Sequence, residues 1–247
     1  MSGSDWNVLV PIEVLEGESV PETVIELLST LPVVLLGYHV LPEQTPPGQA
    51  RMQFEDQAQA KLDDLVAAFD AADGTAETRL VFTHDEDQTV ERVADETGCE
   101  AILHPNPSSR IERLLLPVST DADLDRIAGF VASVVGDRDI ELTLYYVAET
   151  DADVPSGEAV VEEATGLLRE RGVAANAITG DVTVSGAPVR AIATAAADHD
   201  AVVMGESEPS LGSVLFGDPS EQVADRSLGP VIVVRNERDA DASAPAE

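Results

Sequence analysis

Residues 201–235 read AVVMGESEPSLGSVLFGDPSEQVADRSLGPVIVVR, and this stretch decides the fold. The apolar run 201–204 stops at Gly205, as a strand buried inside a parallel sheet does. Near the end of the stretch, Gly229 and Pro230 interrupt the chain, and a second apolar run, Val231–Val234, follows them. The pattern predicts two buried strands that are joined by a long connection.

The connection between these strands predicts a glycine-bearing loop and then a helix. Asp218 suits the N-cap, Pro219 the first helical position and Glu221 the third, which completes a capping box. We expect the helix to run to about Ser227. A glycine loop that leads into a helix N-terminus is a place where a phosphate can bind, because free backbone N–H groups point toward it.

Strands and helices alternate along the rest of the chain, and the alternation runs through twice. Pro117 lies 106 residues after Pro11 in a similar apolar run, and residues 187–204 match 89–103. This internal β-α-β-α-β-α-β repeat predicts an α/β fold with parallel sheets and helices on both faces. The expected strands are 7–12, 33–41, 76–83, 100–103, 113–118, 141–148, 173–182, 201–204 and 231–234, and the expected helices are 18–30, 50–72, 87–97, 121–135, 158–171, 187–198 and 218–227.

The two copies of the repeat are unequal. The first copy is expected to have four strands and the second five, because the glycine loop, last helix and fifth strand have no counterpart before the linker. The position equivalent to Gly205 is Pro105. We therefore predict two Rossmann-like domains: a truncated copy at 1–104, a linker at 105–110, a complete copy at 111–235 and an acidic, disordered tail at 236–247.

The chain is strongly acidic. It has 14 Lys and Arg residues against 47 Asp and Glu, which gives a formal net charge of −33 over 247 residues. Such a surface repels nucleic acid and anionic membranes, so both are excluded as partners. The 44% apolar content supports a packed core and argues against general disorder. We expect a halophilic protein from a cytosol of very high salt, where charge repulsion is screened within about 3 Å at 1 M.

Several expected absences bound the function further. Cys99 is the lone cysteine, so no internal disulfide is expected. No secretory signal is visible and no apolar run approaches the length of a membrane span, which predicts a soluble, cytoplasmic protein. The four histidines, at 39, 84, 104 and 199, lack metal-ligand spacing, so no metal is expected; His39 and His199 are predicted to be packed or edge residues.

Three sequence features together resemble a tandem universal stress protein with a truncated first copy. They are a first strand that ends in a Val-Pro-Val type turn, a fourth strand that ends in Val-Met-Gly, and a closing helix-to-strand segment. The residues are Val10-Pro11-Ile12 and Leu116-Pro117-Val118, then His199-Asp200-Ala201 and Val203-Met204-Gly205, and finally Ser220–Val223 and Pro230–Arg235. The resemblance implies domains of the adenine nucleotide alpha hydrolase-like type.

The resemblance also implies where a nucleotide would bind. Binding members of the family carry G-x2-G-x9-G-[ST] after the fourth strand; here Gly205 fits, but Glu208 and Asp218 replace the second glycine and the Ser/Thr. Ser119 stands where those members carry an Asp near the adenine, and Glu13 is its counterpart in the first copy. The family's cofactor-binding positions are Pro117, Val118, Ser119, Met204, Gly205, Glu208, Gly217, Asp218 and Ser220.

These departures favour a helix that caps itself over one that binds a phosphate. The Asp218 carboxylate supplies the negative charge that a helix N-terminus attracts, which contributes ~0.3–1 kcal/mol. A phosphate here would meet Glu206, Glu208, Asp218 and Glu221, with no cation before Arg226. We therefore expect no bound cofactor, with AMP or ATP as the alternative.

Three functions follow from these patterns. The first is a non-enzymatic universal stress-type regulatory protein that acts through protein contacts; family members also occur fused to membrane transporters, so a transporter-associated regulator is included. The second is an AMP- or ATP-binding stress sensor that uses loop 205–220. The third is a serine hydrolase, but Pro209 breaks the G-x-S-x-G pattern around Ser207 and no histidine has a predictable route to it.

The closing strand carries an expectation about assembly. In a 3-2-1-4-5 strand order like the family's, the fifth strand lies at a sheet edge, and an apolar edge invites pairing. We expect a homodimer through Val231, Ile232, Val233 and Val234, because the first copy encodes no fifth strand to pair with it. The alternative is that the acidic tail or the loop 42–49 covers this edge.

The charge balance predicts that stability depends on salt. With a formal net charge of −33, the folded chain should lose stability as salt falls, because self-repulsion is then no longer screened. Thermal melts in KCl from about 0.1 M to 3 M measure this, and the melting temperature should rise with salt. A melting temperature that does not change across that range would contradict the halophilic interpretation.

Overall fold

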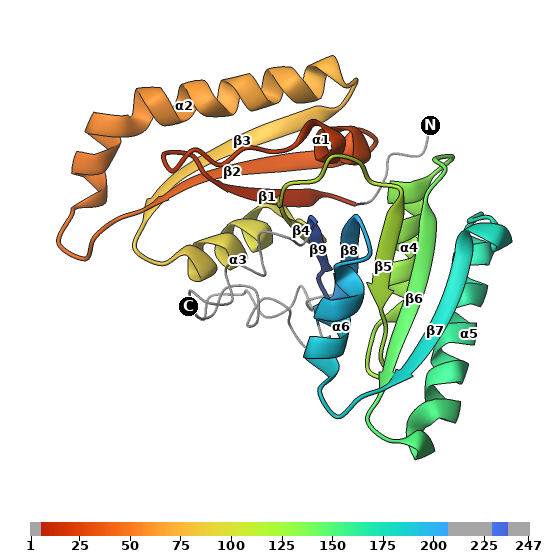
Figure 1. The fold of residues 1–247 in the computed structure, drawn as a ribbon. Coiled ribbons are helices and arrows are strands. Elements are labelled where there is room, and N and C mark those ends of the chain that lie inside the picture. Colours follow the sequence, from red (N-terminus) through yellow and green to blue (C-terminus); the bar gives the residue numbers. More distant parts are fainter. Residues whose placement is uncertain (1–5, 207–228, 237–247) are drawn as a thin grey trace, which may run out of the picture.

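The computed structural model describes residues 6–206 and 229–236. In this part of the chain, nine strands form one mixed sheet with helices on both faces (Figure 1). The strands are β1 (Val8–Glu13), β2 (Pro32–Val40), β3 (Thr75–Thr83), β4 (Ala101–His104), β5 (Arg113–Pro117), β6 (Glu141–Ala148), β7 (Ile178–Val184), β8 (Ala201–Gly205) and β9 (Val231–Val234). The helices are α1 (Glu22–Leu28), α2 (Pro47–Ala71), α3 (Glu86–Thr97), α4 (Leu124–Val135), α5 (Val154–Glu170) and α6 (Pro188–Ala196).

The strand order confirms the repeat. The sheet runs β3-β2-β1-β4-β9-β8-β5-β6-β7, so each copy arranges its first four strands in the order 3-2-1-4. Within each copy these strands are parallel, and Pro11 of β1 pairs with Leu36 as Pro117 of β5 pairs with Tyr145. The predicted helix at 218–227 and its loop lie outside the described residues.

The last strand, β9, is shared by the two copies. It pairs in parallel with β8, where Val203 faces Ile232, and antiparallel with β4, where Leu103 faces Ile232 from the other side. The expectation that Val231–Val234 lies at a sheet edge is therefore wrong. The expected homodimer would pair the backbone groups of Val231, Ile232, Val233 and Val234 with a second chain. These groups are not free, because β4, at the end of the truncated first copy, already pairs with them.

Several element boundaries also differ from the prediction; helix α1, for example, begins at Glu22, directly after Pro21, and not at 18. Helix α5 begins at Val154, ahead of the expected 158, because Thr150 and Asp153 form a capping box on a 3-10 turn that leads into it. Strand β7 begins at Ile178 and not at 173, because a 3-10 turn at Ala175–Ala177 follows Gly172, whose φ is +93°.

The core is continuous on one face of the sheet and divided on the other. Helices α1, α2, α4 and α5 bury a single apolar cluster that includes residues of both copies and Ile232 and Val234 of β9. On the opposite face, α3 packs on β1, β2 and β4, while α6 packs separately on β5, β8 and β9. Trp6 packs edge-on against Phe130, with ring centroids 5.5 Å apart, and joins the start of the first copy to α4.

A buried arginine at the end of the second copy forms hydrogen bonds and ion pairs with the first copy. The side chain of Arg235, which follows β9, is 7% exposed. Its guanidinium donates to Asp95 Oδ1 (2.6 Å) and Glu91 Oε2 (3.1 Å) of α3, and to the carbonyl of Cys99 (3.0 Å). One guanidinium therefore donates to two carboxylates of α3 and to the carbonyl of Cys99, all in the other copy.

None of the helices among the described residues has the length and apolar character of a membrane span.

Removing the Arg235 contact should destabilise the whole chain. We expect Arg235→Ala to lower the free energy of unfolding by about 1–3 kcal/mol, because a buried, charge-assisted set of hydrogen bonds is lost. Urea unfolding in molar KCl, followed by Trp6 fluorescence and far-UV circular dichroism, measures it. The matched control is Arg92→Ala, which removes an exposed pair with Glu96 on the same helix and should cost less than about 0.5 kcal/mol. Equal effects of the two variants would show that Arg235 does not join the copies.

Candidate functional site

The strand order of the second copy reverses at β5, and the edge of the sheet at this reversal, called the crevice below, is where open α/β sheets bind ligands. Strand β5 lies between β6, which follows it in the chain, and β8, which comes later, and it is parallel to both. Ligands of open α/β sheets bind outside the carboxyl ends of the strands at such a point. Pro117 ends β5 and Gly205 ends β8, so these two ends lie at the same edge of the sheet.

Five of the predicted cofactor positions lie at this edge. Met204 is 2% exposed and Val118 5%, so both are packed and only Ser119 among them brings a polar side chain. At Gly205 a Cβ atom would lie 3.0 Å from Ile127 Cδ1, which leaves little room for a larger residue. The other four positions, Glu208, Gly217, Asp218 and Ser220, and Ser207 with them, lie outside the described residues. The phosphate half of the predicted site therefore stays a prediction.

The described mouth of this crevice carries carboxylates. Glu206 donates its backbone N–H to the carbonyl of Val234 (2.8 Å), and its Oε2 accepts from the N–H of Asn236 (2.8 Å). At the start of α4, Asp123 Oδ1 accepts from the N–H of Arg126 (3.0 Å), so the helix N-terminus has an anion of its own. Arg126 donates from Nε to the carbonyl of Arg235 (2.5 Å) and lies 5.2 Å over the Trp6 ring.

The corresponding position of the first copy holds a buried carboxylate. Glu13, at the end of β1, is 8% exposed. Its Oε1 lies 2.8 Å from Nδ1 of His39, and its Oε2 accepts from the N–H of Val40 (3.2 Å). The N–H of Glu13 donates to Oε2 of Glu18 (2.7 Å). The carboxylate that stands where a ligand would bind is thus tied to the neighbouring strand and loop.

Other titratable groups of the first copy are partly removed from water: Tyr38 is buried, His104 is half-buried, and Glu86 is exposed at the start of α3. Tyr38 donates its hydroxyl to Oε1 of Glu86 (2.6 Å). Desolvation raises the pKa of the Glu86 carboxyl, and burial together with Glu86 raises the pKa of the Tyr38 hydroxyl. At the end of β4, burial lowers the pKa of His104. His39 lies edge-on to Phe82 at 6.3 Å. Sequence reasoning missed the Glu13–His39 pair, although both residues stand at carboxyl ends of neighbouring parallel strands.

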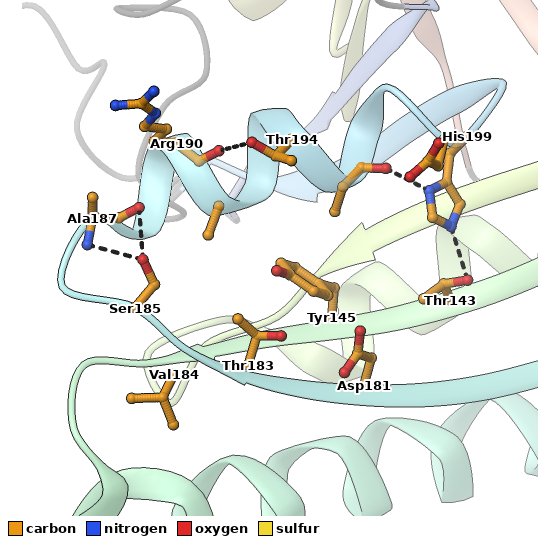
Figure 2. Close-up of a pocket in the computed structure, with 13 residues that line it drawn as sticks. Thr143, Tyr145, Asp181, Thr183, Val184, Ser185, Ala187, Arg190, Thr194 and His199 are labelled. Atoms are coloured by element: carbon orange, nitrogen blue, oxygen red, sulfur yellow. Dashed lines mark hydrogen bonds between the residues drawn. The ribbon is translucent and has the colours of Figure 1, made fainter.

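A second concave feature lies between α6 and the strands β6 and β7 (Figure 2). This groove is open to solvent and has a volume of about 550 Å³. His199 closes one end: its Nδ1 donates to the carbonyl of Ala195 (2.8 Å), which leaves Nε2 to accept from the Thr143 hydroxyl (2.9 Å). Sequence reasoning missed the groove. The only signal was the run Thr179, Asp181, Thr183, which places polar residues on one face of β7.

The burial of His104 predicts a pH dependence of stability. Desolvation lowers the pKa of this imidazole in the folded chain below its ordinary value of 6.5, so between the two pKa values it is the unfolded chain that binds the proton. The free energy of unfolding should therefore fall as the pH falls below 6.5, until the lowered pKa of the folded state is passed. Urea unfolding at a series of pH values compares the wild type with His104→Gln, which should lack this component. A difference between the two proteins that is constant over the series would contradict the assignment.

Comparisons with known proteins identify a matching family and solved structures with a similar fold. A model of the universal stress protein family matches residues 110–235. A universal stress protein from Archaeoglobus fulgidus DSM 4304 aligns with a TM-score of 0.63 at 17% identity, over 93% of this chain and 96% of that one. The cytoplasmic domain of a prokaryotic cation chloride cotransporter aligns with a TM-score of 0.53 at 11% identity, over 92% and 94%.

A single-copy neighbour is known with a nucleotide. This universal stress protein from Archaeoglobus fulgidus was solved in complex with dAMP; it shares 19% identity and a TM-score of 0.37, and covers 50% of this chain and 97% of its own. A search among curated proteins finds no match. The structural likenesses concern the fold, whereas the family match spans just over half of the 247 residues. Together with the repeat and its strand order, it shows that the chain belongs to the universal stress protein family.

Proposed function

We propose that this chain is a non-enzymatic regulatory protein of the universal stress type, which acts through contacts with other proteins. The observation that carries the proposal is the buried Glu13 carboxylate at the end of β1 in the first copy. There the Glu13 carboxylate, with its partners His39 and the N–H of Val40, takes the place that a ligand would need. This copy is then a structural part of the molecule and not a second nucleotide site.

The electrostatics of the second crevice support the same proposal. Glu206 and Asp123 place carboxylates at its described mouth, and the sequence adds Glu208, Asp218 and Glu221. A nucleotide phosphate would approach these groups against the field of a chain whose net charge is −33. Each like-charge contact raises the cost of bringing the phosphate to the backbone N–H groups of the helix.

The kind of partner follows from charge and from fold. An acidic surface is complementary to a basic one, so the partner should present Lys and Arg at the contact. The cotransporter domain shares the two-copy fold along nearly its whole length, so this architecture can serve as the cytoplasmic part of a transporter. A transporter or another membrane-associated protein is therefore the class of partner that we propose.

The competing function is an AMP or ATP sensor in the second copy. It is favoured by the parallel ends of β5 and β8 at the reversal of the strand order, and by Gly205 at the first glycine position of the family motif. Both functions use the same protein, so a direct binding measurement separates them.

Nucleotide titration is the experiment that decides. Calorimetry with ATP or AMP and Mg²⁺ in molar KCl should show no tight binding, because carboxylates replace the second glycine and the Ser/Thr of the motif. The double substitution Glu208→Gly with Asp218→Ser should then improve whatever binding exists. A dissociation constant in the low micromolar range or below for the wild type would contradict the proposal. Weaker binding by the double variant would mean that Asp218 is a ligand of the nucleotide and not a block to it.

A further inference from the structure

We propose that the groove between α6 and the strands β6 and β7 binds a small organic ammonium compound, with the Asp181 carboxylate as its counter-charge. The groove is formed by residues other than those of the crevice at the ends of β5 and β8, so the proposal goes beyond the regulatory function above. Four observations carry it: the two copies differ at these positions, the groove holds polar groups that have no partners among the described residues, the arginine among its described lining residues points elsewhere, and its size suits a small ligand.

The first copy provides an internal comparison. Tyr145 pairs with Pro117 and Asp181, and Leu36 pairs with Pro11 and Arg79 in the same way, so the strand registers match the two copies residue by residue. The groove residues Thr143, Tyr145, Asp181, Thr183 and His199 then correspond to Val34, Leu36, Arg79, Val81 and Cys99. Four of these five first-copy residues pack in the cluster beneath α3. The fold itself therefore does not require polar side chains at these four positions, whereas at the fifth the exposed Arg79 of the first copy stands in place of Asp181.

Polar side chains line the middle of the groove, and among the described residues they have no protein partners; Asp181 is exposed and Thr183 half-buried. Within the described part of the chain, neither the Asp181 carboxylate nor the Thr183 hydroxyl takes part in a hydrogen bond or ion pair. Tyr145 is 7% exposed, and its hydroxyl lies in the space between α6 and the strands (Figure 2). A carboxylate and two hydroxyls thus face one space, where a ligand can bond to all three.

The charge in the groove favours a cation. Arg190 stands on α6, but its guanidinium points away from the strands (Figure 2), so it does not neutralise Asp181. Asp198 adds a second carboxylate to the lining. The cation should be organic and not a metal ion, because no three His, Cys, Asp or Glu side chains in the described residues could hold a metal.

The remaining features suit an ammonium group on a short carbon stem. The hydroxyls of Thr183 and Tyr145 can accept N–H hydrogen bonds, as the carboxylate of Asp181 does. The Tyr145 ring and the methyl groups of Ala191 and Ala195 offer apolar surface to the stem. The volume of about 550 Å³ lies in the range of small-molecule sites in proteins.

Titration with n-butylammonium chloride, followed by the backbone amide signals of the full-length protein, tests the proposal. The wild type should show saturable shifts at Thr183 and its neighbours. Asp181→Asn should raise the dissociation constant at least about fivefold, as the loss of a charged hydrogen bond predicts. Thr183→Val, which restores the first-copy residue, should also weaken binding. The neutral analogue n-butanol, in the same KCl buffer, should bind at least about fivefold more weakly than the ammonium compound.

The control variant is Asp64→Asn on α2, because it removes the same charge from an exposed position outside the groove. It should leave the dissociation constant within about twofold of the wild type, since surface charges that far away are screened. Equal effects of Asp64→Asn and Asp181→Asn would mean general attraction to an acidic protein and would overturn the site. So would equal binding of n-butanol, or the absence of saturable shifts in the wild type.

Discussion

The structure depends on the pairing of β9 with both of its neighbours. Without β9, the apolar strand β4 would end the first copy as an open edge, which is a hazard for aggregation. With it, β4 and β8 are both covered by four residues of one strand. The entry to this strand is tight: at Gly229 a Cβ atom would lie 1.9 Å from the carbonyl oxygen of Asp200, so only glycine fits. At the exit, Arg235 holds the chain to α3.

This pairing also determines how the two copies can act. The strands inside each copy are parallel, but β4 and β9 are antiparallel, so the carboxyl ends of the two copies lie at opposite edges of the sheet. The Glu13–His39 pair and the crevice near Gly205 therefore cannot share one ligand. The first copy instead contributes a strand partner for β9 and the buried contacts around Trp6. In the first copy, Glu13 at the end of β1 already has His39 and the N–H of Val40 as partners.

Much of the fold was predictable because its helices and strands follow from residues that are close together in the sequence. Apolar runs, caps and the 106-residue offset between Pro11 and Pro117 gave the elements and the repeat. The partner of β9 was not predictable in this way, since an antiparallel pairing between Leu103 and Ile232 joins residues far apart in the sequence. The start of α5 was missed because Thr150 and Asp153 cap a 3-10 turn first.

The site was predictable only in part. The Val-Pro and Met-Gly motifs placed Pro117 and Gly205 at strand ends, and parallel pairing then brought those ends to one edge. The Glu13–His39 pair was not predictable, because the contact depends on how side chains of two neighbouring strands pack, and the sequence near either residue does not specify that packing. The groove beside α6 was hidden because alternating polar residues such as Asp181 and Thr183 are also what a solvated edge strand carries.

Isotope-edited nuclear Overhauser contacts across β4 and β9 test the shared strand most directly. Facing residues of an antiparallel pair bring their backbone protons close together. The account predicts contacts between Ala101 and Val234 and between Leu103 and Ile232, all within one chain. In a sample that mixes labelled and unlabelled protein, these contacts should not appear between chains. Contacts that are absent, or that occur only between different chains, would contradict the shared strand and restore an edge-to-edge dimer.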